Sequence, residues 1–158
     1  MLDLLKLLEE NARYTVPELA AMLGTSESEV KAALAACEKS GVIRGYKAII
    51  DWDRTERDYV SARIELKVTP KRDRGFEELA EQIARFPEVQ SVYLMSGGYD
   101  LALTIVGENF KDIASFVAYR LAPMDSVLST ATHFVLRRYK DRGAMLVEPG
   151  RDERSVML

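Results

Sequence analysis

Two short clusters of residues have the side chains and the spacing needed for molecular recognition. The first runs from Ser26-Glu27-Ser28-Glu29 to Lys31, at the start of an expected helix. Serine hydroxyls and a lysine ammonium can contact DNA bases or phosphates, and the free N–H groups of a helix N-terminus can hold a phosphate. Two later cations are candidates for phosphate contacts. The candidate DNA-binding residues are Ser26, Glu27, Ser28, Lys31, Arg44 and Lys47.

The second cluster is Ser96-Gly97-Gly98-Tyr99-Asp100, which lies between two expected strands. Because glycine adopts positive φ at little cost, a plain β-hairpin turn would already explain Gly97 and Gly98. Exposed N–H groups in this turn can also hold a carboxylate, and the Asp100 carboxylate can pair with an α-amino group. A zwitterionic amino acid would suit both. The candidate effector-binding residues are Met95, Ser96, Gly97, Gly98, Tyr99, Asp100, Thr130 and Thr132, the two threonines sharing one face of a later strand.

Several kinds of site are excluded by what the chain contains. Cys37 is the only cysteine and His133 the only histidine. An intrachain disulfide, a zinc finger and a two-histidine metal centre are therefore ruled out. We expect no metal, no cofactor and no enzymatic activity.

The composition, with 47% hydrophobic and 30% charged residues, is typical of a globular protein. No apolar run approaches the roughly 20 residues that cross a bilayer, and the N-terminus lacks the ordered regions of a signal peptide. We therefore expect a cytoplasmic protein without a membrane partner. The net charge of −3 argues against nonspecific coating of nucleic acid. Residues 1–50 hold six Lys or Arg against seven Asp or Glu, so the candidate DNA-binding half is not basic.

Helices are expected to position the first cluster. Thr15-Val16-Pro17-Glu18 is a capping box with proline in the first turn, and it opens a short helix that stops at Gly24. Ser26-Glu27-Ser28-Glu29 is a second capping box, whose helix ends before Gly41. Two helices joined by a turn of about three residues that contains glycine form the helix-turn-helix signature.

Strands and helices alternate after the helix-turn-helix. Val60 to Val68 alternates apolar and polar residues, which predicts a half-buried strand. The remaining pattern predicts a helix from Phe76 to Ile83, strands over 89–95 and 101–106, a helix from Phe110 to Leu121 and a strand over 127–139. This βαββαβ order is ferredoxin-like, with both helices on one face of the sheet. The other face is partly apolar, so a second copy is expected to cover it in a symmetric dimer.

The predicted fold class is α+β, with four consecutive parts. Residues 41–43 and 46–50 predict a short β-ribbon, the wing, and Trp52 is expected to pin the linker against a neighbouring domain. The parts are a winged helix-turn-helix DNA-binding domain (1–50), a linker (51–59), a βαββαβ effector and oligomerisation domain (60–140) and a C-terminal tail (141–158).

Three segments in this order resemble the Lrp/AsnC (feast/famine) transcription regulators. They are the stretch from Val16 to Tyr46, Ser96-Gly97-Gly98-Tyr99-Asp100-Leu101, and Thr130-Ala131-Thr132-His133-Phe134-Val135-Leu136. The resemblance implies a helix-turn-helix on a regulatory (RAM-type) domain, assembled into dimers and often octamers. It also implies binding to upstream double-stranded DNA and a response to amino acids or related metabolites, with the glycine-containing loop near the dimer interface.

The chain departs from the family at Ala32 and Ala33, where members usually carry basic residues in the recognition helix. The function predicted is that of a sequence-specific regulator of transcription, modulated by an amino acid or related metabolite at the dimer interface of the C-terminal domain. The target is expected to be a pseudo-palindrome with half-sites about one helical turn apart or a multiple of that.

Two other functions remain open. One is an amino-acid-sensing oligomer without DNA binding, which the charge balance of residues 1–50 would suit. The other is an enzyme similar to the tetrapyrrole decarboxylases that share this two-domain shape. Such chemistry needs histidine or arginine groups around an acidic tetrapyrrole, and the single His133 disfavours it.

Overall fold

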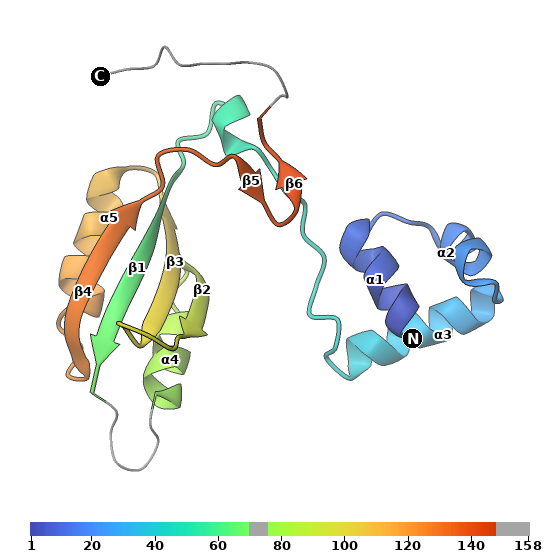
Figure 1. Ribbon diagram of the computed structural model, residues 1–158, viewed down its shortest axis with the longest axis horizontal. Helices are drawn as coiled ribbons and strands as arrows, with labels where there is room; N and C mark the ends of the chain where they lie inside the picture. Colours follow the sequence, from blue (N-terminus) through green and yellow to red (C-terminus); the bar gives the residue numbers. More distant parts are fainter. Residues whose placement is uncertain (70–75, 148–158) are drawn as a thin grey trace. The chain divides into compact units, whose positions relative to one another are not determined.

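The computed structural model describes residues 1–69 and 76–147, and the chain forms two compact units, Met1–Ala48 and Ile49–Leu158 (Figure 1). The first unit consists of helices, and the second is built on an antiparallel sheet. Most of the predicted tail, residues 148–158, lies outside the described residues. Among the described residues, no helix is long and apolar enough to cross a membrane.

The helical unit contains α1 (Leu2–Glu10), α2 (Val16–Leu23) and α3 (Glu27–Lys39). Both predicted capping boxes are confirmed: the Thr15 and Ser26 side chains cap α2 and α3, and Glu18 and Glu29 bond back to the cap residues. Gly24 ends α2 in the left-handed conformation at φ 63°, which costs glycine little. The helix-turn-helix therefore follows from local sequence signals.

The core of the helical unit is small. Its buried residues are Leu4, Leu19, Ala20 and Val30, and partly buried residues such as Leu8 and Leu34 pack around them. Cys37 is also buried, at 1% exposure, and fills an apolar position of α3. The three helices thus meet along one apolar stripe each, and the opposite side of α3 stays exposed.

The predicted β-ribbon over residues 41–50 is wrong, because these residues form no strand. The backbone instead turns through Gly41 and Gly45, both at positive φ, and the Ile43 N–H bonds the Cys37 carbonyl at 3.1 Å. An isolated two-stranded ribbon is marginal without a core to cover. Val42 and Tyr46 are 58% and 49% exposed, so this segment buries little apolar surface within the helical unit.

The second unit confirms the βαββαβ order. Its elements are β1 (Val60–Val68), α4 (Glu77–Ala84), β2 (Val89–Leu94), β3 (Leu101–Gly107), α5 (Phe110–Phe116) with the π-helical turn η2 (Val117–Leu121), and β4 (Val127–Phe134). The strands pair antiparallel in the order β2-β3-β1-β4, which is the ferredoxin-like topology.

Both helices cover the same face of the sheet, as the sequence predicts. Ile64 of β1 and Leu103 of β3 face each other across the ladder and join one buried cluster with Ile83 of α4 and Ile113 of α5. Alternation along β1 places every second residue in this cluster. The sheet's other face is left open.

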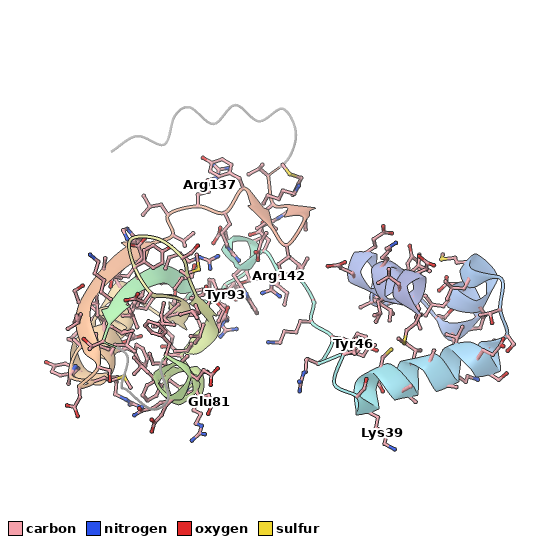
Figure 2. The ribbon with its side chains drawn as sticks, turned by 60° about the horizontal axis from the view of Figure 1, so that its bottom comes forward. Lys39, Tyr46, Glu81, Tyr93, Arg137 and Arg142 are labelled. Atoms are coloured by element: carbon pink, nitrogen blue, oxygen red, sulfur yellow. The ribbon has the colours of Figure 1, made fainter. Side chains whose placement is uncertain are left out.

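The open face carries polar and apolar rows. Ser91, Thr104, Arg63 and His133 lie opposite one another on the four strands, and the serine and the arginine both donate hydrogen bonds to the Thr104 hydroxyl. The neighbouring row includes Tyr93, which extends from β2 and is 57% exposed (Figure 2). The face is therefore partly apolar, with His133 on the surface of the unit.

The predicted end of the last strand is wrong, because β4 stops at Phe134 and not near Tyr139. A small hairpin follows, β5 (Lys140–Asp141) with β6 (Ala144–Met145), which no sequence pattern predicted. The segment that leads into this hairpin packs on the 3₁₀ turn η1 (Trp52–Arg54). Arg138 Nη2 lies 3.7 Å from Asp53 Oδ1, and the guanidinium carbon lies 5.2 Å from the centre of the Tyr59 ring. Trp52 stacks on Tyr59, another residue of the predicted linker, with 5.7 Å between the ring centres.

Candidate DNA-binding and effector sites

The start of α3 is a network of local hydrogen bonds. Ser26 accepts a bond from the Glu29 N–H and donates its hydroxyl to Glu29 Oε2 at 2.8 Å, and its hydroxyl lies 3.0 Å from that of Ser28. The Thr25 hydroxyl donates to the same carboxylate oxygen. Thr25 was not among the predicted site residues, although its place four residues before Glu29 could have indicated this contact. The capping residues keep their hydroxyls within the cluster.

Electrostatics at this helix end are dominated by carboxylates. The hydrogen bonds from the Thr25 hydroxyl and from the Ser26 N–H and hydroxyl lower the pKa of Glu29 to about 2, so it is ionised at neutral pH. Lys31 lies 3.7 Å from Glu27, one turn away on the same face. The single cation of this surface is therefore shared with a carboxylate, which weakens its attraction for phosphate.

The cations that follow α3 lie in an irregular segment. The Arg44 guanidinium lies over Gly41, where an added Cβ would come within 3.1 Å of its central carbon. The Tyr46 hydroxyl donates to Glu38 Oε1 at 3.1 Å, and burial together with this bond raises the pKa of Tyr46. Lys47 is exposed beyond it, and Lys39 extends into solvent at the end of α3 (Figure 2). The helical unit thus presents Arg44 and Lys47 outside the acidic start of α3.

The loop between β2 and β3 is closed by backbone hydrogen bonds. The Met95 N–H donates to the Asp100 carbonyl at 2.8 Å, and the Asp100 N–H donates to the Leu66 carbonyl at 2.9 Å. Gly97 has φ 135°, as expected, whereas Gly98 does not adopt positive φ, so only one of the two glycines is required by backbone geometry. Residues Met95 to Gly98 stay exposed and Tyr99 is half-buried.

Asp100 has a structural contact that the sequence did not reveal. Its Oδ2 accepts a hydrogen bond from the Val68 N–H at 2.9 Å, where the pairing of β1 with β4 shifts register. One carboxylate oxygen therefore ties the loop to the central strand. The arrangement can still offer backbone N–H groups and the remaining carboxylate oxygen to a ligand.

Thr130 and Thr132 share a face, but it is the helix-covered one. They pair with Leu66 and Ile64 of β1, and both are half-buried on the edge strand β4. Leu66 also pairs with Leu101 of β3, so Thr130 reaches the same end of the sheet as the loop. Two strand spacings, about 10 Å, separate Thr130 from β3. The structure thus brings the loop and Thr130 to one end of the sheet, on either side of β1.

Comparisons with known proteins agree across nearly the whole chain. The family described as Lrp/AsnC ligand binding domain matches residues 61–145, and the family described as winged helix-turn-helix DNA-binding matches residues 1–44. The HTH-type transcriptional regulator YugG of Bacillus subtilis is 45% identical, with 99% of this chain and 94% of that protein covered.

Two further proteins extend the comparison. The leucine-responsive regulatory protein of Rhizobium meliloti is 29% identical, with 89% of each chain covered. The crystal structure of a transcriptional regulator from Neisseria meningitidis, in complex with L-Met, matches with a TM-score of 0.70 and 26% identity, over 87% of this chain and 88% of that one.

Proposed function

The chain belongs to the Lrp/AsnC family of transcription regulators, and from this premise we propose that it binds upstream DNA as a homodimer under the control of an amino acid. It is a regulator with a helix-turn-helix domain and a ligand-binding domain. The proposal adds the DNA target, the class of effector and the assembly. It places the protein in the cytoplasm with the DNA and assigns it a binding role, without catalysis or a cofactor.

The exposed outer surface of α3 is the observation that carries the DNA-binding proposal. Val30 and Cys37 point into the core, while the start of the helix and Lys31 remain on the surface. The N-terminal residues of the second helix of a helix-turn-helix face base edges in the major groove. We assign base contacts to Ser26, Glu27, Ser28 and Lys31 and phosphate contacts to Arg44 and Lys47.

The loop over residues 95–100 supports the effector proposal. Its exposed glycines leave backbone N–H groups accessible to a carboxylate, and Asp100 carries the opposite charge for an amino group. Relatives include a leucine-responsive regulator and a regulator solved with L-Met. We assign the effector contacts to Met95 through Asp100 and the effector to the amino acids, whereas Thr130 and Thr132 lie on the helix-covered face, across β1 from the loop. Binding near an interface would couple to DNA affinity through assembly.

The open sheet face supports the homodimer. Tyr93 and its neighbour Ala102 lie on it beside Glu65, and a second copy would cover them. Pairs of such dimers could build a larger ring such as an octamer. Analytical ultracentrifugation of the Tyr93→Arg variant tests whether this face forms the homodimer. A shift toward monomer supports the dimer interface, and an unchanged mass contradicts it.

Fluorescence anisotropy on the protein's own upstream DNA and on a scrambled duplex tests the main proposal. At near-physiological salt we expect a preference of about tenfold or more for the upstream DNA. Equal or absent binding to both duplexes would contradict sequence-specific regulation. Titration of amino acids into the complex then identifies those that change the affinity.

The contribution of phosphate contacts is read from the salt dependence. The double variant Arg44→Gln/Lys47→Gln should weaken binding to all sequences and reduce the salt slope by about 2, one per lost contact. Arg85→Gln/Lys111→Gln removes two exposed cations from the sheet unit and is the matched control. Equal effects of both variants would place the phosphate contacts elsewhere.

The acidic start of α3 favours one alternative, an amino-acid-sensing oligomer that does not bind DNA. Glu29 is held ionised and Glu27 shares the charge of Lys31, so both oppose a phosphate backbone. In that case the Arg44→Gln/Lys47→Gln variant would leave the affinity for the amino acid unchanged. Fluorescence anisotropy would then show no binding of the protein to either DNA duplex.

A further inference from the structure

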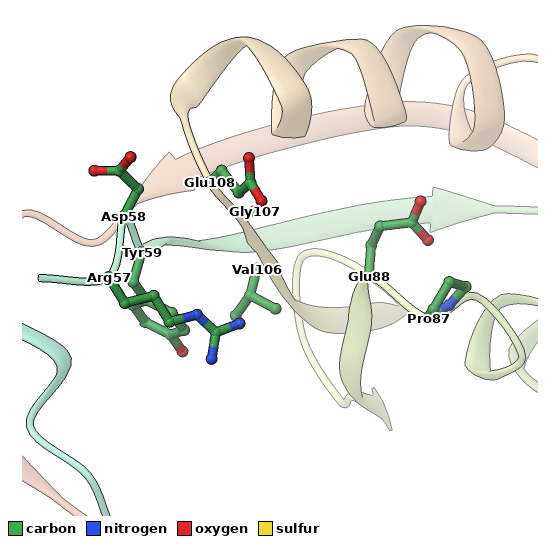
Figure 3. Close-up of a pocket in the computed structure, with 8 residues that line it drawn as sticks. All are labelled: Arg57, Asp58, Tyr59, Pro87, Glu88, Val106, Gly107 and Glu108. Carbon is green, nitrogen blue, oxygen red and sulfur yellow. The ribbon is translucent and has the colours of Figure 1, made fainter.

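A cavity lies in the sheet unit, away from the loop over residues 95–100. It has a volume of about 260 Å³ and opens where β1 begins and β3 ends (Figure 3). Arg57, Asp58 and Tyr59 reach it from the segment before β1, Glu88 from the residue before β2, and Gly107 and Glu108 from the end of β3.

Strand geometry separates this cavity from the candidate effector loop. The loop joins the end of β2 to the start of β3, whereas the cavity lies beside the start of β2 and the end of β3. A six-residue strand such as β2 spans about 20 Å. A ligand in the cavity would therefore occupy a different site from the proposed effector.

The charges around the cavity favour a cation. Asp58, Glu88 and Glu108 contribute three carboxylates, against the one guanidinium of Arg57. One oxygen of Glu88, Oε2, is buried and has no hydrogen-bond partner among the described residues. Buried polar atoms are nearly always paired, so an unpaired carboxylate oxygen beside a cavity indicates a donor that is missing. A bound ammonium group would supply up to three such donors.

Arg57 links the cavity to the segment that follows the helical unit. Its guanidinium lies 4.5 Å from the centre of the Trp52 ring, and that ring stacks on Tyr59, which also lines the cavity. A ligand that contacts Arg57 or Tyr59 would therefore alter the environment of Trp52. Because Trp52 is the only tryptophan of the chain, the tryptophan fluorescence comes from this one position.

We propose that this cavity binds a small metabolite carrying a protonated primary amine, such as a diamine or a basic amino acid. Cavities for drug-sized ligands measure roughly 300–1,000 Å³, so the smaller volume here suits a ligand of amino-acid size. The amine lies against Glu88, with Glu108 and Asp58 supplying further negative charge, and a carboxylate on the ligand, where present, pairs with Arg57. The site biases the connecting segment through Trp52.

Titration of the full-length protein with 1,4-diaminobutane, followed by Trp52 fluorescence and by equilibrium dialysis of the labelled diamine, tests this site. We expect saturable binding, weakened at least tenfold by Glu88→Gln, which keeps the shape of the side chain and removes its charge. Glu78→Gln, on the exposed start of α4, is the matched control and should bind like the original protein. Magnesium chloride at equal ionic strength controls for charge screening.

Three results would overturn the proposal: no saturable binding by dialysis, equal loss in both glutamine variants, or the same response to magnesium chloride. Thermal unfolding of Glu88→Gln shows whether a loss of binding reflects a loss of fold. None of these measurements depends on DNA binding or on the loop over residues 95–100. The cavity can therefore fail while the proposed regulator stands, and the reverse also holds.

Discussion

The helical unit and the sheet unit both contain local side-chain hydrogen bonds, but the sheet unit adds bonds between residues far apart along the chain. In the helical unit, Thr15 bonds Glu18 and Ser26 bonds Glu29, three residues apart. In the sheet unit, Val68 bonds Asp100 across 32 positions of sequence and Arg63 bonds Thr104 across 41. The apolar cores differ in the same way, because the sheet core joins β1, β3, α4 and α5. The structure of a unit held by local contacts can be predicted from short stretches of sequence, whereas a unit held by long-range contacts depends on the whole fold.

The largest effect is expected for Ile64→Ala, a substitution in the central strand of the sheet unit. Ile64 is fully buried, so the cavity and the lost burial should destabilise the sheet unit by about 4 kcal/mol. Trp52 lies in this unit, and its fluorescence during urea unfolding measures the effect. The helical signal should unfold at its original midpoint. A common shift of both signals would mean that the two units unfold as one.

Leu19→Ala makes the reciprocal change in the small helical core. Leu19 is 1% exposed, and its truncation should cost about 3 kcal/mol within a unit that has few other buried residues. Circular dichroism at 222 nm should show earlier loss of helix, while the Trp52 midpoint stays in place. An effect no larger than that of Met22→Ala, an exposed position of the same helix, would contradict this account of the core.

Asp100→Ala tests the long-range hydrogen bond by itself. Loss of the contact to the Val68 N–H should lower the free energy of unfolding of the sheet unit by about 2 kcal/mol, since the acceptor is charged. Asp100→Asn keeps a carbonyl acceptor for that N–H but loses the charge that would pair with an amino group. Asparagine should therefore restore most of the stability and still abolish the amino-acid response. Equal stability of both variants would show that the bond contributes little.

Ser26→Ala is the smallest change and the local counterpart. Removal of the cap should cost the helical unit about 1 kcal/mol, and Ser26→Thr should restore most of it. Circular dichroism of urea unfolding measures both variants.

Glu29 adds a pH dependence to this cap. Its pKa is about 2 in the folded protein and 4.5 ordinarily, so its stabilising effect is complete above pH 4.5 and is lost as pH falls toward 2. The stability of Ser26→Ala should fall less steeply over this range, because fewer hydrogen bonds hold the carboxylate. A parallel acid profile would contradict the role of Glu29.

The features that could be predicted from the sequence are the ones that depend on local contacts. The capping residues of α3, the βαββαβ order and the single covered sheet face could all be predicted, because hydrophobic periodicity and helix capping depend on residues close together in the sequence. The absence of strand pairing over residues 41–50 could not be predicted, since a segment with β-forming residues becomes a strand only where a partner strand and a core exist. The hairpin of β5 and β6 was missed because two-residue strands carry no periodic signal.

By itself the sequence determined the capped helices of the first unit, the order of the elements in the βαββαβ domain and the buried face of β1, because capping and hydrophobic periodicity are properties of residues close together in the chain. Only the tertiary structure decided that Asp100 anchors the central strand and that Thr130 lies across β1 from the loop. It also decided that one Glu88 oxygen beside a cavity has no hydrogen-bond partner within residues 1–69 and 76–147. Each of these depends on the order and register of strands that are tens of residues apart. Pairing between distant strands is set by the packing of the whole unit, which no short stretch of sequence contains.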